Sequence, residues 1–191
     1  MKKIGIVTDS HSSISQEEAE KLGIFVLPMP FYIDGECFYE SVTLSRELFF
    51  EKLAAGADIT TSQPSPTAVM EIWDKALEQF EKILYLPISS GLSGSYETAM
   101  MLAKDEAYEG RVLVVDDGQV AAPLHQMVLD TLDMIKKGYE AEQIRDLLER
   151  AGDRMMIYIA LQTLECLKKG GRVTPAAAAL GSVFNIKPIL K

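Results

Sequence analysis

Short runs of apolar residues alternate along this chain with longer stretches in which apolar positions recur every three or four residues. The runs predict buried strands, and the longer stretches predict amphipathic helices. The predicted strands cover 3–8, 82–88 and 111–115, and the predicted helices lie between Ser15 and Gly23, after Ser45, and over 67–81, 96–103, 119–137 and 141–151. Alternating strands and helices over 1–152 predict an α/β domain, with a mostly parallel sheet flanked by helices.

Local signals indicate where two of these helices begin. Ser15 and Glu18 have the spacing of a capping box, and Gly23 fits the position just after the helix end. Ser65 followed by Pro66 is typical of a helix cap and first helical residue. The two helices therefore have their starts specified by the local sequence.

Between these helices the chain is less regular. An apolar run over 24–33 contains Pro28 and Pro30, which predicts an edge or irregular strand because proline cannot donate to a ladder. Asp34-Gly35 followed by 36–39 predicts a hairpin turn and a return strand.

A second domain is expected after residue 152. A new strand is predicted over 155–161, an alanine-rich stretch follows at 175–180, and an apolar, strand-like segment covers 185–190. A strand needs a partner, so we expect 153–191 to be the beginning of an incomplete α+β domain.

Composition and net charge reduce the classes of partner that this protein is expected to bind. The chain has 191 residues, is 48% hydrophobic and 25% charged, and carries a net charge of −9. The proportions are those of a globular protein, and the acidic charge disfavours nucleic acid and anionic lipid surfaces as partners. No apolar stretch predicts a stable membrane anchor, so we expect a cytoplasmic protein. Cys37 and Cys166 are expected to be small, buried thiols in a reducing compartment.

Three polar loops follow the predicted strands, at 8–13, 89–95 and 116–118. Ligands of open parallel sheets bind beyond the carboxyl ends of the strands. In the second loop Gly91 and Gly94 alternate with serines before a helix, which suits an anion, and Ser93 offers a hydroxyl donor. A glycine turn with a serine cap explains the same residues without a ligand.

A second hydroxyl-rich cluster, at 60–66, favours a ligand. Neither cluster contains a cation, and a P-loop is absent from the sequence. Hydroxyls without a cation suit a carboxylate better than a polyphosphate. We take these two clusters, which include Thr61, Ser62, Ser93, Gly94 and Ser95, as the candidate ligand-binding segments.

The sequence gives weaker signals for a catalytic serine, a metal site or a partner surface. Residues 91–95 narrowly miss the nucleophile elbow of serine hydrolases, and His11 and His125 are the available histidines. His11 could reach a pocket or be a solvated loop residue. The adjacent Asp116 and Asp117 predict a turn or cap, and no residue spacing indicates a metal or another cofactor. The basic residues Lys168, Lys169 and Arg172 are either a helix end or a partner surface.

Five motifs in order resemble the DegV family of bacterial fatty-acid-binding proteins. They are IVTDS at 6–10, TTSQPSP at 60–66, ISSGLSGSY at 88–96, TLECLKKGGRV at 163–173 and NIKPIL at 185–190. The resemblance implies a two-domain α/β protein that holds one long-chain fatty acid, with Thr61 and Ser93 on the carboxylate. His11 stands where a small or hydroxyl residue is more usual in the family.

The resemblance also implies a partner and a place in phospholipid metabolism. Some members are the binding subunit of a fatty acid kinase, and a separate kinase protein phosphorylates the carboxylate that they present. Lys168, Lys169 and Arg172 would then contact that kinase. Two alternatives stay open: an acyl or phosphoryl transferase or hydrolase with Ser93 as nucleophile, and a structural subunit with a vestigial pocket.

Overall fold

A computed structural model describes residues 2–40, 42–161, 164–174 and 189–190. The chain forms two compact units, residues 1–29 with 63–155 and residues 30–62 with 156–191. The segment 30–62 leaves the parallel sheet and groups with the C-terminal segment. The domain boundary expected at 152 stays a prediction. Pro28 lies at the point of departure, between β2 (Phe25–Leu27) and β3 (Pro30–Ile33).

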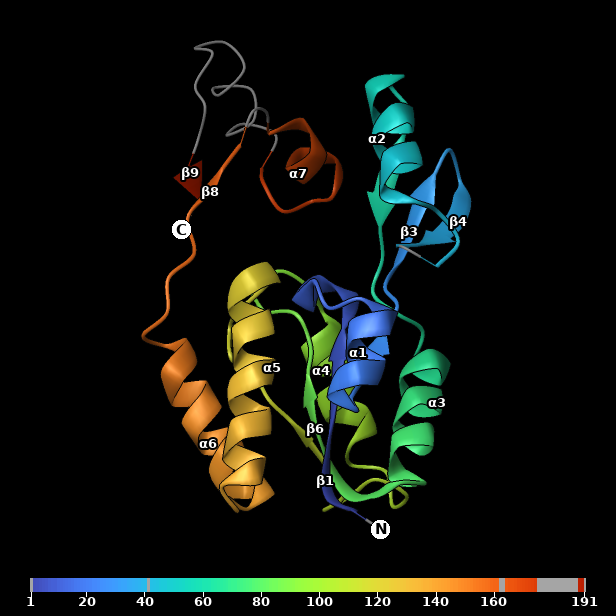
Figure 1. The fold of residues 1–191 in the computed structure, drawn as a ribbon. Helices are drawn as coiled ribbons and strands as arrows, with labels where there is room; N and C mark the ends of the chain where they lie inside the picture. The colour runs from blue at the N-terminus through green and yellow to red at the C-terminus, as the bar shows by residue number, and fades with distance from the viewer. Residues whose placement is uncertain (1, 41, 162–163, 175–188, 191) are drawn as a thin grey trace. The chain divides into compact units, whose positions relative to one another are not determined.

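The first unit contains a four-stranded sheet of order β2-β1-β6-β7, parallel throughout. Its elements are β1 (Lys2–Asp9), the 3-10 helix η1 (Ser10–Ser12), α1 (Gln16–Leu22), β2, α3 (Pro66–Leu77), β6 (Phe80–Leu86), α4 (Ser95–Leu102), β7 (Val112–Val114), α5 (Ala121–Lys136) and α6 (Ala141–Gly152). The mostly parallel α/β architecture is confirmed (Figure 1).

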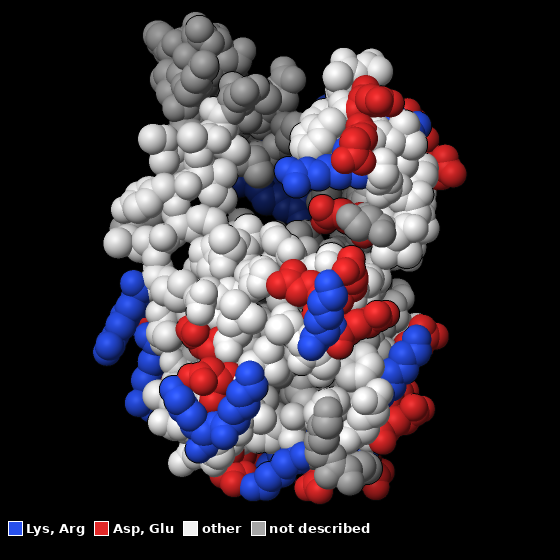
Figure 2. All heavy atoms as spheres, in the orientation of Figure 1, with Lys and Arg blue, Asp and Glu red and all other residues white. Residues whose placement is uncertain are grey.

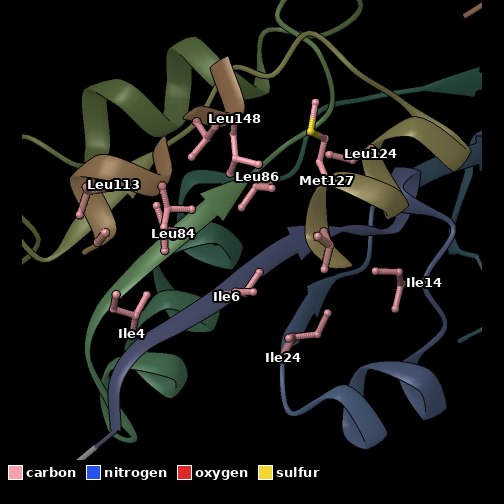
Figure 3. Packing of buried hydrophobic residues seen from close by; sticks show 14 of the residues in the cluster. Ile4, Ile6, Ile14, Ile24, Leu84, Leu86, Leu113, Leu124, Met127 and Leu148 are labelled. Carbon is pink, nitrogen blue, oxygen red and sulfur yellow. The ribbon is translucent and has the colours of Figure 1, made fainter. Parts of the chain in front are cut away.

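Side chains of the strands alternate between two buried clusters. On one face, Ile4 and Ile6 of β1 and Leu84 and Leu86 of β6 pack with α1, α5 and α6, as Figure 3 shows. On the other face, residues of β1 and β6 such as Val7 and Ile83 pack with α3 and α4 around Trp73. The period of two in a strand produces these two faces, so the sheet is the middle layer of three.

At Gly5, the backbone of β1 packs directly against the ring of Phe80, the first residue of β6. A Cβ atom at Gly5 would lie 2.6 Å from two ring carbons of Phe80. Phe80 itself is only 4% exposed and begins β6. A side chain at position 5 would therefore displace a buried aromatic ring.

Sequence signals for helix ends agree with the structure at two helices. Ser65 Oγ accepts a hydrogen bond from Ala68 N at 3.2 Å, and Pro66 is the first residue of α3. Ser15 Oγ accepts from Glu18 N at 3.1 Å, and Gly23 ends α1 in the left-handed conformation. The serine cap of each helix and the glycine end of α1 are confirmed.

The second unit is built from antiparallel pairs. Its three-stranded sheet has the order β4-β3-β5, with β4 (Glu36–Tyr39) and β5 (Ile59–Thr61), and α2 (Arg46–Ala54) lies between them in the chain. The predicted hairpin is confirmed, since Asp34 and Gly35 both have the positive φ of a type I′ turn. A second pair joins β8 (Ile159–Ala160) to β9 (Ile189–Leu190), and α7 (Glu165–Lys169) lies between them in sequence.

Several predicted boundaries were wrong. The helix expected over 67–81 ends at Leu77, and the run 24–33 is two strands in different sheets. The strand expected over 155–161 is only two residues long, and the alanine-rich stretch 175–180 lies outside the described residues. Cys37 is exposed rather than buried, since it lies on the edge strand β4; the side chain of Cys166 is outside the description.

Charged side chains of both signs are interspersed on the face shown in Figure 2. Within the first unit, Lys3 pairs with Glu140 and Lys137 with Asp133, all at well-exposed positions. Exposed pairs of this kind contribute little to stability. Among the described helices, none combines the length and apolar character that crossing a membrane requires.

Candidate functional site

The sheet order places a topological switch point between β1 and β6. The chain passes from β1 to β2 on one side, and β6 pairs with β1 on the other. Ligands of open α/β sheets bind in the crevice outside the carboxyl ends of such strands. Two of the polar loops predicted from sequence, 8–13 and 89–95, begin at this edge.

Asp9 joins the ends of these two strands. Its carboxylate is fully buried and accepts a hydrogen bond from Ile88 N at 2.8 Å, just beyond β6. The other oxygen accepts from His11 N at 2.9 Å and lies 3.2 Å from His11 Nδ1. Asp9 therefore fixes the loop after β1 and the start of the loop after β6 with one carboxylate.

The loop 89–95 is held by its own serines. Ser93 Oγ lies 2.8 Å from Ser95 Oγ and accepts a hydrogen bond from Ser95 N at 3.2 Å. Ser95 is only 2% exposed and begins α4, whereas Ser93 is half-buried and Gly94 is exposed. The Ser93 hydroxyl is thus positioned by the first turn of α4.

Gln63 was missed by sequence reasoning, although it stands inside the hydroxyl-rich segment 60–66. Its Oε1 accepts a hydrogen bond from Thr98 Oγ1 at 3.3 Å. A Cβ atom at Gly94 would lie only 3.0 Å from the same oxygen. The Gln63 side chain therefore contacts the loop 89–95 and α4 within the first unit, and glycine at position 94 leaves room for that contact.

Thr61 and Ser62 belong to the second unit. Thr61 ends β5, is exposed and pairs with Phe31, while Ser62 N donates to Pro30 O at 3.4 Å. Only Ser62 separates Thr61 from Gln63 in the chain. The role of Thr61, Ser62, Ser93, Gly94 and Ser95 in holding a ligand stays a prediction.

A third loop, after β7, accepts hydrogen bonds from the backbone of the serine loop. Asp116 Oδ1 accepts from Ser90 N at 3.4 Å, and Gln119 O accepts from Ser89 N at 2.9 Å. Gln119 Nε2 in turn donates to the carbonyl groups of Asp117 and Gly152 at 3.1 and 3.2 Å. The serine loop is therefore connected through Gln119 to the end of α6.

Asp117 is an unusual carboxyl group in this loop. It is 2% exposed; its Oδ1 accepts from Gln119 N at 2.9 Å, and its Oδ2 has no hydrogen-bond partner in the described structure. Burial, with smaller contributions from the charges of Asp116 and Asp9, raises the pKa of Asp117 to about 7. The two adjacent aspartates thus have different surroundings, since Asp116 bonds backbone N–H groups nearer the surface.

The basic residues Lys168, Lys169 and Arg172 lie at the C-terminal end of α7. Gly171 has a φ of 74°, and its N–H donates to Lys168 O at 3.0 Å, while Arg172 N donates to Leu167 O at 2.8 Å. This pattern is a Schellman motif. Lys169 Nζ donates to Asp58 Oδ1 at 2.7 Å within the same unit. The helix-end interpretation explains the local geometry, and a partner role for Lys168, Lys169 and Arg172 stays a prediction.

The remaining histidine lies away from these loops in the chain, on α5. His125 Nε2 is 3.1 Å from Glu18 Oε1, and both side chains are partly exposed. Over the part of the chain that the structure describes, no group of three or more His, Cys, Asp or Glu side chains is arranged to hold a metal ion.

Comparison with known proteins shows which family this chain resembles. The profile of the DegV family, described as an uncharacterised protein family, matches residues 3–191. A DegV domain-containing protein of Caldanaerobacter subterraneus is 32% identical over 190 residues, which are 100% of this chain and 68% of the relative. One from Deinococcus radiodurans is 36% identical over 188 residues, or 98% of this chain and 66% of the relative.

Solved structures show the same resemblance. A fatty-acid-binding DegV family protein of Thermus thermophilus is 34% identical, with a TM-score of 0.86 over 98% of this chain and 67% of its own. DegV of Bacillus subtilis, a fatty acid binding protein, is 26% identical, with a TM-score of 0.84 over 100% of this chain and 68% of its own. The chain spans about two thirds of the length of these relatives.

Proposed function

Because this chain belongs to the DegV family, we propose that it binds one long-chain fatty acid and catalyses no reaction on it. In this proposal the hydroxyls of Thr61 and Ser93 hold the carboxylate, and an apolar tunnel takes the alkyl tail. Ser62, Gly94 and Ser95 complete the surroundings of the head group. The family members of known structure that are named as fatty acid binding proteins support the ligand class.

One observation carries the choice of head-group residues. Within the first unit, Gln63 Oε1 lies against Gly94 of the serine loop and accepts from Thr98, and Thr61 stands two residues before Gln63 in the chain. Hydroxyl donors from both segments suit a carboxylate, which accepts several hydrogen bonds at once. Charge-assisted bonds of this kind are each worth about 1.5–3 kcal/mol.

The alternative of a Ser93 nucleophile has less support. A serine nucleophile needs an adjacent general base. Ser93 Oγ lies 2.8 Å from the hydroxyl of Ser95, and a hydroxyl is not a base at neutral pH. The arrangement therefore favours binding over acyl transfer or hydrolysis.

We also propose a kinase protein as the partner that acts on the bound carboxylate. Phosphorylation requires ATP, so the two proteins would meet in the cytoplasm. Lys168 and Arg172 are both exposed at the Schellman motif, which supports contact with an acidic surface.

The head-group proposal is tested with Thr61→Val and Ser93→Ala. Each should weaken palmitate binding about tenfold or more, since each removes one hydroxyl donor. Thr60→Val is the matched control for Thr61, because neighbouring residues of β5 point to opposite faces of the strand. Calorimetric titration measures the affinities; unchanged binding in both variants would place the carboxylate elsewhere.

A further inference from the structure

His11 and Asp9 form a pair whose geometry exceeds what capping the 3-10 helix requires. Asp9 caps η1 by accepting from the backbone N–H of His11 at 2.9 Å. That bond would be present with any residue at position 11. The imidazole adds a second contact, from Nδ1 to the same oxygen at 3.2 Å, so the side chain itself is held in place.

The contact determines which ring nitrogen carries the proton in neutral His11. Asp9 accepts from backbone N–H groups at both of its oxygens, Ile88 N on one and His11 N on the other. It therefore acts as an acceptor, and Nδ1 is the donor. Nε2 of the neutral ring is then an acceptor, and it makes no hydrogen bond with any residue that the structure describes.

The imidazole is also partly exposed. The His11 side chain is 36% exposed, whereas the Asp9 side chain is fully buried. The buried carboxylate behind this partly exposed imidazole fixes the orientation of the ring, as in many binding and catalytic sites. An oriented imidazole with one open nitrogen is suited to exchanging a proton with a ligand.

The His11–Asp9 pair lies at the carboxyl ends of β1 and β6, the edge of the sheet described above as the candidate ligand site. His11 lies in η1, directly after β1, and the Asp9 carboxylate reaches Ile88 at the start of the loop that carries Ser93. Both elements belong to the first unit and flank the switch point between β1 and β6. His11 is thus at the edge of the sheet at which an α/β fold binds its ligand.

We propose that His11 is a further head-group residue, whose Nε2 shares one proton with the carboxyl group of the bound ligand. The proton lies between nitrogen and oxygen, whether it arrives with a neutral acid or from solvent with a carboxylate. Asp9 is a positioning residue that holds the ring in this orientation through Nδ1. This inference rests on the proposed fatty acid function and selects free acids over esters.

The test compares two ligands and two histidines. His11→Ala should weaken palmitate binding about 10- to 100-fold, because a charge-assisted hydrogen bond is lost. It should leave the affinity for methyl palmitate unchanged, since the ester has no proton to share. His125→Ala is the matched control: that histidine also faces a carboxylate, 3.1 Å away on Glu18, and should change neither affinity.

A spectroscopic readout separates the proton-sharing role from a structural one. The ¹⁵N resonance of His11 Nε2 should move to the protonated range when palmitate is added, and should not move with methyl palmitate. Equal loss of both ligands in His11→Ala, or no loss of either, would overturn the inference while leaving fatty acid binding by the wild type intact. Failure of the wild type to bind palmitate would instead overturn the proposed function and this inference with it.

Discussion

Replacing Asp117 with asparagine should make the first unit more stable at high pH. Asp117 is 2% exposed and its Oδ2 has no partner among the described residues, so ionising it leaves a buried, half-satisfied charge. Its pKa in the folded protein is about 7, against an ordinary value of 3.8. Asparagine has nearly the same shape, keeps an oxygen for Gln119 N and cannot ionise.

The sign follows from proton binding. Between pH 3.8 and about 7 the folded protein holds a proton on Asp117 that the unfolded chain has lost. Stability therefore falls as the pH rises through this range and stays low above pH 7. Each pH unit of the difference corresponds to about 1.4 kcal/mol, so the maximum penalty is about 4 kcal/mol. Asp117→Asn should remove most of this pH dependence.

The assay is urea unfolding at pH 5 and pH 8, followed by tryptophan fluorescence. Trp73 is the single tryptophan and is fully buried in the first unit, so its signal reports that unit. The variant should gain about 1–4 kcal/mol over wild type at pH 8, and less at pH 5. Asp116→Asn, on the neighbouring half-buried carboxylate, is the control. An unchanged pH dependence in Asp117→Asn would refute the reasoning.

Three further predictions follow from the same structure. Gly152→Ala should cost about 1–3 kcal/mol in urea unfolding, because its Cβ would lie 2.0 Å from Asp117 O; Gly91→Ala, where the nearest atom is a serine oxygen at 3.5 Å, should not. Affinity should rise with fatty acid chain length, by about 0.8 kcal/mol per buried methylene, until the tunnel is filled; tight acetate binding would contradict this. Arg172→Ala should leave palmitate binding intact and weaken kinase-dependent phosphorylation, the more so with added salt; loss of palmitate binding would place Arg172 at the ligand.

The central sheet could be predicted because each strand carries its own signal. β1 and β6 are buried on both faces and read as continuous apolar runs, and Asp34-Gly35 has the residues that a type I′ turn requires. The helix 67–81 was predicted too long because Phe80 continues the apolar spacing of Trp73, Ala76 and Leu77, although it begins a strand.

Features that depend on distant partners could not be predicted. β5 consists of Ile-Thr-Thr beside a polar segment, and only its pairing with β3 makes it a strand. Nothing local shows that 30–62 groups with the C-terminal segment rather than with the parallel sheet. Asp117 looks like a turn residue, yet the end of α6 at Gly152 buries it.

The candidate site was predicted in part. The serine loop and the segment 60–66 were chosen for their hydroxyls, but Gln63, whose side chain contacts the serine loop, has no signal of its own. His11 was ambiguous because its orientation depends on a carboxylate two residues earlier, whose burial only the fold determines.

Native mass spectrometry of the protein purified from bacteria tests the fatty acid proposal most directly. We expect a mass excess equal to one long-chain fatty acid, present under native conditions and absent after denaturation, because the ligand is held without a covalent bond. The amount bound should fall in Ser93→Ala. An excess that survives denaturation and maps to Ser93 would contradict the proposal in favour of an acyl-enzyme, and a protein that neither carries nor takes up fatty acid would contradict binding altogether.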